Sequence, residues 1–209
     1  LPVGRPSFTK PISFKTIENE PGRFYISNTK IPGEQTDSWS KFGINAYRDL
    51  DLRYGSLTKL LSIEDEVVYV QERGFGILSI NPRAIISAND GIPTELGSNV
   101  GVQDYKYLST DSGSFHQFSI LATNNSLSFY DSLNNRWVMH TATKDGGTTS
   151  LAENKGFQSV FLNLLETGVG LHKSDNPYLE GSVVSFYDST HREYYMTFHG
   201  LLCPELIDP

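Results

Sequence analysis

Short runs of β-branched and aromatic residues recur along this chain of 209 residues, and turn-forming residues separate them. Residues 66–71 and 75–80 flank Glu72-Arg73-Gly74, in which the glycine can adopt a positive φ. Residues 126–131 and 136–141 flank a similar short connection. Connections of this length can join only antiparallel neighbours. The pattern therefore predicts a mainly β fold built from antiparallel hairpins.

Other segments extend this pattern. Further strands are expected at 23–27, 117–123, 182–188 and 193–199. Residues 117–141 then form one meander, and the last two strands form a hairpin. Residues 81–113 are expected to be mostly loop, with Asn89-Asp90-Gly91 as a turn. A helical turn is expected from Asn45, and the leucine-rich stretch after Gly55 is either a turn or a strand.

One helix is expected within this β pattern, at about residues 151–165. Ser150 precedes Glu153 by three positions, which is the spacing of a capping box. Apolar residues at helical spacing follow, at Val160, Phe161, Leu164 and Leu165. Gly168 and Gly170 are expected to end the helix.

A five-residue motif occurs twice. Ser128-Phe129-Tyr130-Asp131-Ser132 and Ser185-Phe186-Tyr187-Asp188-Ser189 are identical, and each precedes a turn and a further strand. The aspartates suit turns because a carboxylate accepts nearby backbone N–H groups. We expect Asp131 and Asp188 at equivalent turns, with His140 and His199 at matching places. Recurring meanders favour a β-propeller-like fold, although such hairpins are common in all-β proteins.

The length limits how complete such a propeller can be. A blade takes roughly 40–50 residues, so the chain holds at most about four blades. A propeller must close to protect its strand edges. We therefore expect an incomplete propeller, completed by another segment of a longer parent chain or by a partner.

The expected organisation has two parts. Residues 1–45 form an extended, proline-rich arm with loops, because the prolines at 2, 6, 11 and 21 disfavour regular structure. Residues 46–209 form the propeller-like β domain. The chain begins with Leu1 rather than Met. We expect it to be part of a longer protein, either processed or only partly ordered.

Composition narrows the classes of function. The chain has 24 acidic and 17 basic residues, and this balance disfavours an electrostatic grip on nucleic acid. Cys203 is the single cysteine, so no intrachain disulfide is possible. No apolar run reaches the roughly 18 residues of a membrane span, and no signal segment opens the chain.

Side chains that could perform chemistry form no recognisable set. His116, His140, His172, His191 and His199 lack metal-ligand spacing, and Cys203 has no partner at a motif distance. The expected catalytic, cofactor and metal residues are therefore none. Propeller glycosidases need paired carboxylates, and the candidates are Asp65, Asp104, Asp131, Asp188 and Glu193. No spacing singles out a pair, so we expect no enzyme and no cofactor.

An ordered series of segments between about residues 48 and 200 resembles the muzzle, or tail-nozzle, proteins of crAss-like podoviruses. In chain order, the series is Tyr47-Arg48-Asp49-Leu50, Tyr54-Gly55-Ser56-Leu57-Thr58-Lys59-Leu60, Val67-Val68-Tyr69-Val70-Gln71-Glu72-Arg73-Gly74, Ile80-Asn81-Pro82-Arg83-Ala84, Tyr107-Leu108-Ser109-Thr110, Gly113, His116-Gln117-Phe118-Ser119, Lys155-Gly156-Phe157-Gln158, and Asp175-Asn176-Pro177 through to Tyr187-Asp188. The resemblance covers about three quarters of the chain.

The resemblance implies a structural protein of the virion, located in the phage tail. Its implied partners are copies of itself in a homo-oligomeric ring, other tail proteins (adaptor or ring proteins and tail hub proteins) and the rest of its parent chain. Genomic DNA would pass through the ring during ejection without specific binding, and we expect an acidic inner wall. The alternative is a glycan-binding or glycan-cleaving β-propeller module. Exposed aromatic residues around one funnel would favour that alternative.

Overall fold

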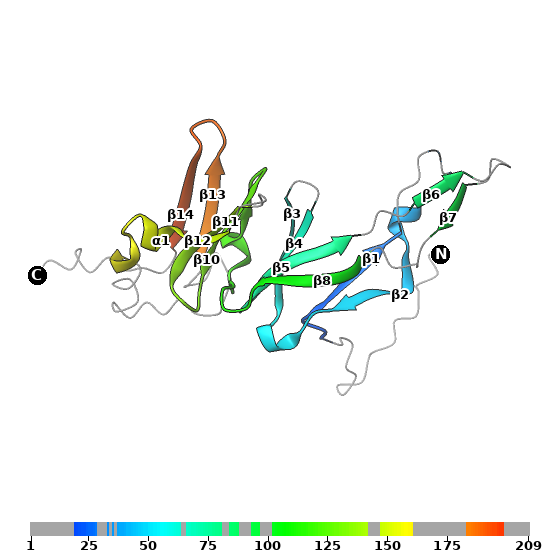
Figure 1. The fold of residues 1–209 in the computed structure, drawn as a ribbon, viewed down its shortest axis with the longest axis horizontal. Coiled ribbons are helices and arrows are strands. Elements are labelled where there is room, and N and C mark those ends of the chain that lie inside the picture. The colour runs from blue at the N-terminus through cyan, green and yellow to red at the C-terminus, as the bar shows by residue number, and fades with distance from the viewer. Residues whose placement is uncertain are drawn as a thin grey trace, which may run out of the picture.

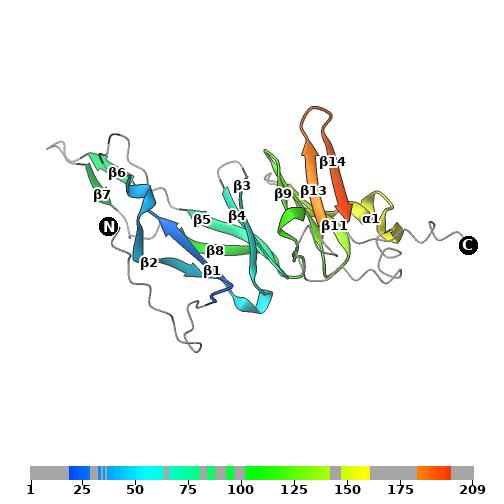
Figure 2. The same cartoon turned by 180° about the vertical axis from the view of Figure 1, so that it is seen from behind.

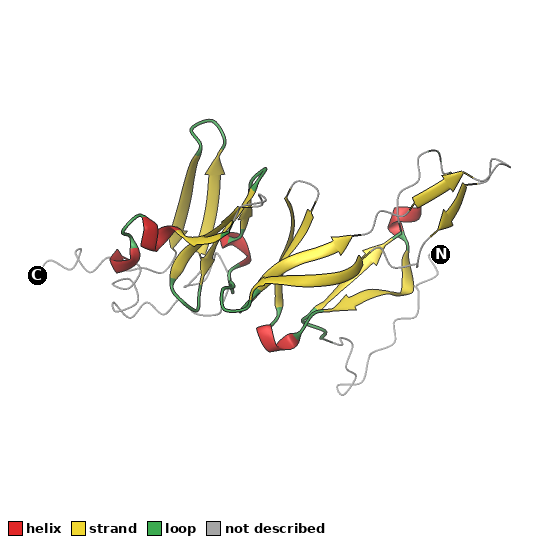
Figure 3. Ribbon diagram, in the orientation of Figure 1, coloured by secondary structure: helices red, strands yellow, loops and turns green. Residues whose placement is uncertain are grey.

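A computed structural model describes residues 19–28, 33, 35, 37–63, 66–80, 84–87, 93–96, 102–141, 147–160 and 183–198. Within these ranges the protein is mainly β, as predicted, with antiparallel sheets and one short α-helix (Figures 1 and 3). The molecule is elongated, and four of its sheets follow one another along the long axis in chain order, whereas β6 and β7 lie at the N-terminal end of that axis (Figure 1).

Five antiparallel sheets make up the described fold. They are β1 (Arg23–Ser27) with β2 (Phe42–Asp49); β3 (Leu57–Ile63), β4 (Glu66–Gln71), β5 (Phe75–Ile80) and β8 (Val102–Ser109); β6 (Ala84–Ser87) with β7 (Pro93–Leu96); β9 (Leu121–Ala122), β10 (Ser126–Asp131), β11 (Arg136–Thr141) and β12 (Thr148–Ser150); and β13 (Val183–Asp188) with β14 (Glu193–Phe198). The three hairpins β4–β5, β10–β11 and β13–β14 confirm the predicted antiparallel pairs.

Several predicted loops and helical segments are strands instead. The segment 81–113 contains β6, β7 and β8, and β8 pairs with β5 along its length. The turn expected at 89–91 lies outside the described residues. The helical turn expected from Asn45 is wrong, because β2 runs through it and pairs with β1. That strand also crosses the expected domain boundary at 45/46, and the division into an arm and a β domain stays a prediction.

Two further expectations need correction. Residues 117–119 form a 3-10 helix, and only Leu121–Ala122 of the predicted strand 117–123 pairs with β10. The predicted helix 151–165 is interrupted. The side chain of Ser150 accepts the predicted capping bond from the Glu153 amide, but α1 (Leu151–Asn154) ends before Gly156, which has a φ of 75°. Residues 161–182 lie outside the described ranges.

Four of the five sheets stack face to face as layers. One apolar core joins β1–β2 to the β3–β4–β5–β8 sheet, with Phe24, Tyr69 and Leu78 among its buried residues. A second core joins the other face of that sheet to the β9–β12 sheet, where Phe75 contacts Phe129. A third joins the β9–β12 sheet to β13–β14. Every residue of β10 is buried, because both faces of its sheet are covered.

The repeated motif does form equivalent hairpins. Asp131 pairs with Arg136 and Asp188 with Glu193, each across a four-residue turn. The last turn residues, Asn135 and Arg192, both have positive φ. This register corrects the predicted match of His140 with His199: the residue that corresponds to His140 is Thr197, and His199 lies outside the described ranges.

The two hairpins pack through corresponding faces. Tyr130 of β10 lies in one buried core with Val183 of β13, whereas the neighbouring Phe129 faces the opposite sheet. Trp137 and Tyr194, which occupy corresponding positions, contact each other with ring centroids 6.2 Å apart. Successive blades of a propeller are related by rotation about its axis, so they contact through opposite faces. The packing of these two hairpins is instead that of a two-layer sandwich.

Candidate functional site

The most connected polar group in the described fold is the carboxylate of Asp131. It is fully buried and accepts hydrogen bonds from the amides of Leu133 and Asn134 and from the Asn134 side chain. Both amides donate to Oδ1, whereas Arg136 Nε donates at 3.2 Å to Oδ2, the oxygen that also accepts from the Asn134 side chain. The strand register places Arg136 opposite Asp131, so the hairpin itself supplies the cation. These bonds show a turn-stabilising carboxylate with its acceptor positions occupied.

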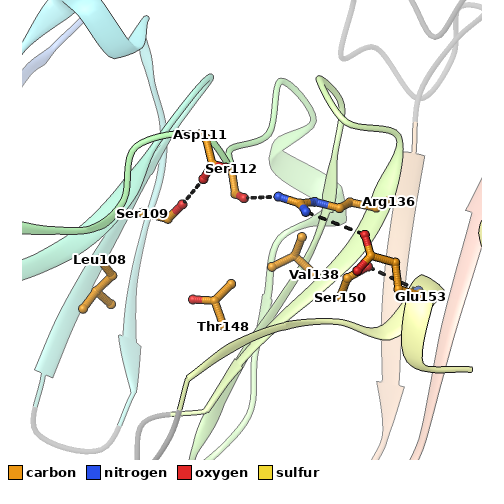
Figure 4. Close-up of a pocket in the computed structure, with 9 residues that line it drawn as sticks. All are labelled: Leu108, Ser109, Asp111, Ser112, Arg136, Val138, Thr148, Ser150 and Glu153. Atoms are coloured by element: carbon orange, nitrogen blue, oxygen red, sulfur yellow. Dashed lines mark hydrogen bonds and ion pairs between the residues drawn. The ribbon is translucent and has the colours of Figure 1, made fainter.

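A polar cavity of about 280 Å³ adjoins this turn (Figure 4). Arg136 extends along it and donates from Nη2 to Ser112 Oγ at 2.7 Å, and its Nη1 lies 4.0 Å from Glu153 Oε1. Ser109 donates to Asp111. The lining residues are Leu108, Ser109, Asp111, Ser112, Arg136, Val138, Thr148, Ser150 and Glu153. None is a histidine or cysteine, and the ionisable lining residues are Asp111, Arg136 and Glu153. The cavity lies where the loop after β8 joins the β9–β12 sheet and α1.

Among the described carboxylate candidates, Asp188 and Glu193 are neighbours across the β13–β14 hairpin, whereas Asp104 and Asp131 lie on other strands. Asp104 lies on β8 and accepts a bond from the Tyr105 amide of its own strand, whereas Asp131 is in the β10–β11 turn. Asp188 lies in the β13–β14 turn, where His191 Nδ1 contacts it at 2.6 Å. That hydrogen bond lowers the pKa of Asp188. Glu193 pairs with Asp188 across the hairpin and accepts from Tyr195, and Asp65 lies outside the described residues.

The histidines are also separate. His140 is buried against Phe75, and its Nδ1 lies 3.2 Å from Thr148 Oγ1. His116 is buried beside Tyr130, and His191 is exposed in its turn. His172 and His199 lie outside the described ranges. In the part of the chain that the structure describes, no group of three or more His, Cys, Asp or Glu residues could hold a metal ion.

In the described part of the chain, five of the exposed large hydrophobic residues lie on the two terminal hairpins, and the others are Trp39, Leu52, Leu60, Phe118, Leu133, Phe157 and Val160. Tyr25, Phe42 and Ile44 of β1–β2 are 60%, 59% and 96% exposed, and we call them the N-terminal patch. Phe186 and Tyr195 of β13–β14 are 62% and 47% exposed, and they form the C-terminal patch. Strand periodicity cannot show which face a further layer covers, so it missed both patches.

None of the helices among the described residues has the length and apolarity that crossing a bilayer demands. The two patches are features of the described surface that a function must explain. Large exposed apolar groups on sheet faces are typical of surfaces that contact other protein.

Comparison with known proteins gives the family. A family model described as crassvirus muzzle protein matches residues 7–202. The chain is also 26% identical, over 205 residues, to the muzzle protein of Bacteroides phage crAss001. That match covers 94% of this chain but only 14% of the length of the relative. Because the family model spans nearly the whole sequence, the chain belongs to the crassvirus muzzle protein family.

Proposed function

We propose that this chain is a structural part of a phage tail, in the nozzle through which DNA leaves the particle. The observation that carries the proposal is the family match over residues 7–202. The fold is consistent with a structural role. Its described polar groups stabilise turns and sheet junctions, and its terminal hairpins expose apolar residues suited to contact with protein.

In this proposal, copies of the protein form a ring that extends and closes the DNA exit channel. The contacts of this chain are with neighbouring copies, with the rest of its own parent chain, and with adaptor or ring proteins and tail hub proteins. Genomic DNA passes without specific binding. The two four-stranded meanders, β3–β4–β5–β8 and β9–β12, are the candidates for propeller blades, because they share one apolar core.

The test is the location of the chain in purified particles. Antibodies raised against the exposed β13–β14 turn should label the tip of the tail in electron micrographs, and a particle reconstruction should place this fold in a ring on the tail axis. A fold located on the capsid, or off the axis without a like neighbour, would contradict the proposal. Peptide mass spectrometry of the same particles gives the length of the mature chain.

A glycan-binding module remains the second candidate, and the exposed aromatic residues of β1–β2 favour it. Tyr25 and Tyr47 lie side by side with ring centroids 6.1 Å apart, and Trp39 nearby in sequence is half exposed. Binding of the purified protein to host capsule polysaccharide, lost in Tyr25→Ala, would support this reading. Cleavage of that polysaccharide, lost on substitution of Asp65, Asp104 or Glu193, would overturn the expectation of no enzyme.

A further inference from the structure

In the four-layer stack, the inner sheet faces are buried against one another, and the outward faces of the first and last layers are exposed. In the described part of the chain, the large hydrophobic residues that are exposed on strands are Tyr25, Phe42, Ile44, Leu60, Phe186 and Tyr195. All but Leu60 lie on the two terminal hairpins. The inner sheets have apolar cores on both faces. The exposed apolar strand surface is thus concentrated in the two end layers.

The repeat indicates what kind of surface covers the C-terminal patch. Phe186 corresponds to Phe129, and Tyr195 to Val138, in the equivalent β10–β11 hairpin. Phe129 and Val138 are buried, and they pack against the apolar face of the neighbouring antiparallel sheet. The outward face of β13–β14 therefore carries apolar residues at the same positions as the equivalent face of β10–β11. In β10–β11 that face is covered by another sheet.

The outward face of β1–β2 is a second described sheet face that is apolar and exposed, and on another copy of the chain it could cover the C-terminal patch. Tyr25 and Phe42 lie on that face, since Phe42 pairs with Ser27, two positions after Tyr25. Ile44 lies in the bulge between these pairs and is almost fully exposed. A residue of that size at the tip of a bulge suits insertion between the side chains of a facing hairpin.

Charge favours contact between unlike ends. The C-terminal patch is bordered by Asp188 and by Glu193, which accepts a bond from Tyr195. Two C-terminal patches in contact would bring these carboxylates together, and like charges across an interface oppose association. The N-terminal patch instead has balanced charges on its own face, where Arg23 pairs with Asp49. It is also next to Lys41, which is exposed and immediately precedes Phe42. Contact between unlike patches places this ammonium group near the carboxylates.

We propose that copies of this chain associate head to tail, with Phe186 and Tyr195 of one copy packed on Tyr25, Phe42 and Ile44 of the next. Such a contact joins two different surfaces, so it can repeat around a ring. The hypothesis rests on the proposed function, because it assigns the contact between ring subunits to these hairpins.

Zero-length carbodiimide cross-linking of purified virions tests the contact in the native assembly. The expected product joins Lys41 to Glu193 or Asp188. Within one copy, β2 and β14 lie toward opposite ends of the long axis, so this link can form only between copies (Figures 1 and 2). If peptides of the chain are present in virions but this link is absent, the head-to-tail contact is wrong and the structural role stands. If the peptides are absent from virions, the proposed function itself fails.

Cysteine variants of the purified chain separate the possible pairings. In a Cys203→Ser background, Ile44→Cys and Tyr195→Cys together should give a ladder of disulfide-linked multimers, and each variant alone should stay monomeric on a denaturing gel. Dimers from Tyr195→Cys alone would show contact between like ends and would overturn the proposal.

The apolar contact has its own control. Phe186→Asp should weaken self-association in sedimentation velocity at least about tenfold, because a large aromatic residue is lost from the contact. Leu133→Asp, at an exposed turn position outside both patches, should leave it unchanged. Equal self-association of Phe186→Asp and the parent chain would contradict the proposed surface.

Discussion

At the scale of single residues, Asp131 and Asp188 occupy corresponding turn positions in different environments. Both carboxylates accept backbone N–H groups two and three residues ahead. Asp131 is fully buried and also bonds to Arg136, whereas the Asp188 side chain is 26% exposed and contacts an exposed histidine. The same motif should therefore matter more in the buried hairpin, because water cannot replace the lost bonds there.

We expect Asp131→Ala to lower the free energy of unfolding by about 2–4 kcal/mol, since it leaves Arg136 and two amides without their acceptor. Asp188→Ala is the matched control and should cost clearly less, because water can replace the lost bonds there. Urea denaturation at one fixed protein concentration measures both. Equal losses would show that burial does not decide how much each carboxylate contributes.

His140 links stability to pH. Burial lowers its pKa below the ordinary value of 6.5, so the folded protein favours the neutral ring. The unfolded chain then binds a proton more readily, and stability should fall as the pH drops below about 6.5. Asp49, whose pKa Arg23 lowers by a hydrogen bond, loses its contribution only near and below its ordinary value of 3.8. The two effects therefore occupy separate pH ranges.

The prediction for His140 is a change in slope. Between about pH 7.5 and about pH 5.5, the urea midpoint of the parent chain should decrease, and His140→Gln should show a smaller decrease because its amide does not titrate. An unchanged slope in His140→Gln would assign the pH dependence to another group.

At the scale of elements, the β3–β4–β5–β8 sheet depends on a glycine that lies against an aromatic ring. Gly76 of β5 pairs with Tyr69 of β4, and Tyr69 is fully buried. A Cβ atom on Gly76 would lie 2.5 Å from the Tyr69 hydroxyl and would also collide with the Lys106 carbonyl of β8. The two neighbouring strands can approach β5 because this position has no side chain.

Gly76→Ala should therefore destabilise the protein by about 2–3 kcal/mol, the cost of overpacking a close strand contact. Gly147→Ala is the matched control, because a Cβ atom there meets nothing within 4 Å. Its effect should stay within about 0.5 kcal/mol. Thermal unfolding of the two variants distinguishes steric crowding from a general effect of losing a glycine.

The two equivalent turns also differ in how well their last residue suits its backbone. Arg192 has a φ of 58° and Asn135 a φ of 49°. Asparagine tolerates this left-handed region better than arginine, and Asn135 also accepts a bond from the Tyr130 hydroxyl. The β13–β14 turn thus contains avoidable backbone strain.

Replacement by glycine should act in opposite directions at these turns. Arg192→Gly should stabilise the chain by about 0.5–1 kcal/mol by removing the strain, and Asn135→Gly should destabilise it by a similar amount because it loses the Tyr130 bond. Urea midpoints measure both changes. A stabilising effect of Asn135→Gly would show that its hydrogen bond contributes little.

At the scale of the whole molecule, the chain is an elongated stack with an acidic surplus, 24 acidic against 17 basic residues. If it lines a channel for DNA, a basic wall would hold the duplex through counterion release, whereas an acidic wall would repel it. The repulsion extends about one Debye length, roughly 8 Å at physiological salt.

We expect the purified chain to leave a short DNA duplex unshifted in gel electrophoresis at physiological salt, up to about 100 µM protein. A basic DNA-binding domain in the same buffer provides the positive control. Binding at tens of micromolar that weakens steeply with added salt would indicate a basic surface and would contradict the acidic wall.

Local sequence determined the hairpins, because their signals lie within a few residues. Glu72-Arg73-Gly74 marked the β4–β5 turn, and the repeated aspartate marked the β10–β11 and β13–β14 turns. The absence of metal-ligand spacing was also visible from the sequence alone. The ordered series of motifs pointed to the muzzle family, which the family model confirms.

Tertiary contacts decided the rest. The segment that forms β8 was predicted as loop, because its own residues give only a weak strand signal. It becomes a strand by pairing with β5. Phe129 and Phe186 occupy the same position of the repeated motif, but Phe129 is buried and Phe186 is exposed. The difference arises because a further sheet covers the β10–β11 hairpin and not the outward face of β13–β14. Periodicity assigns a side chain to a face of a strand, but only the packing of distant segments decides whether that face meets protein or solvent.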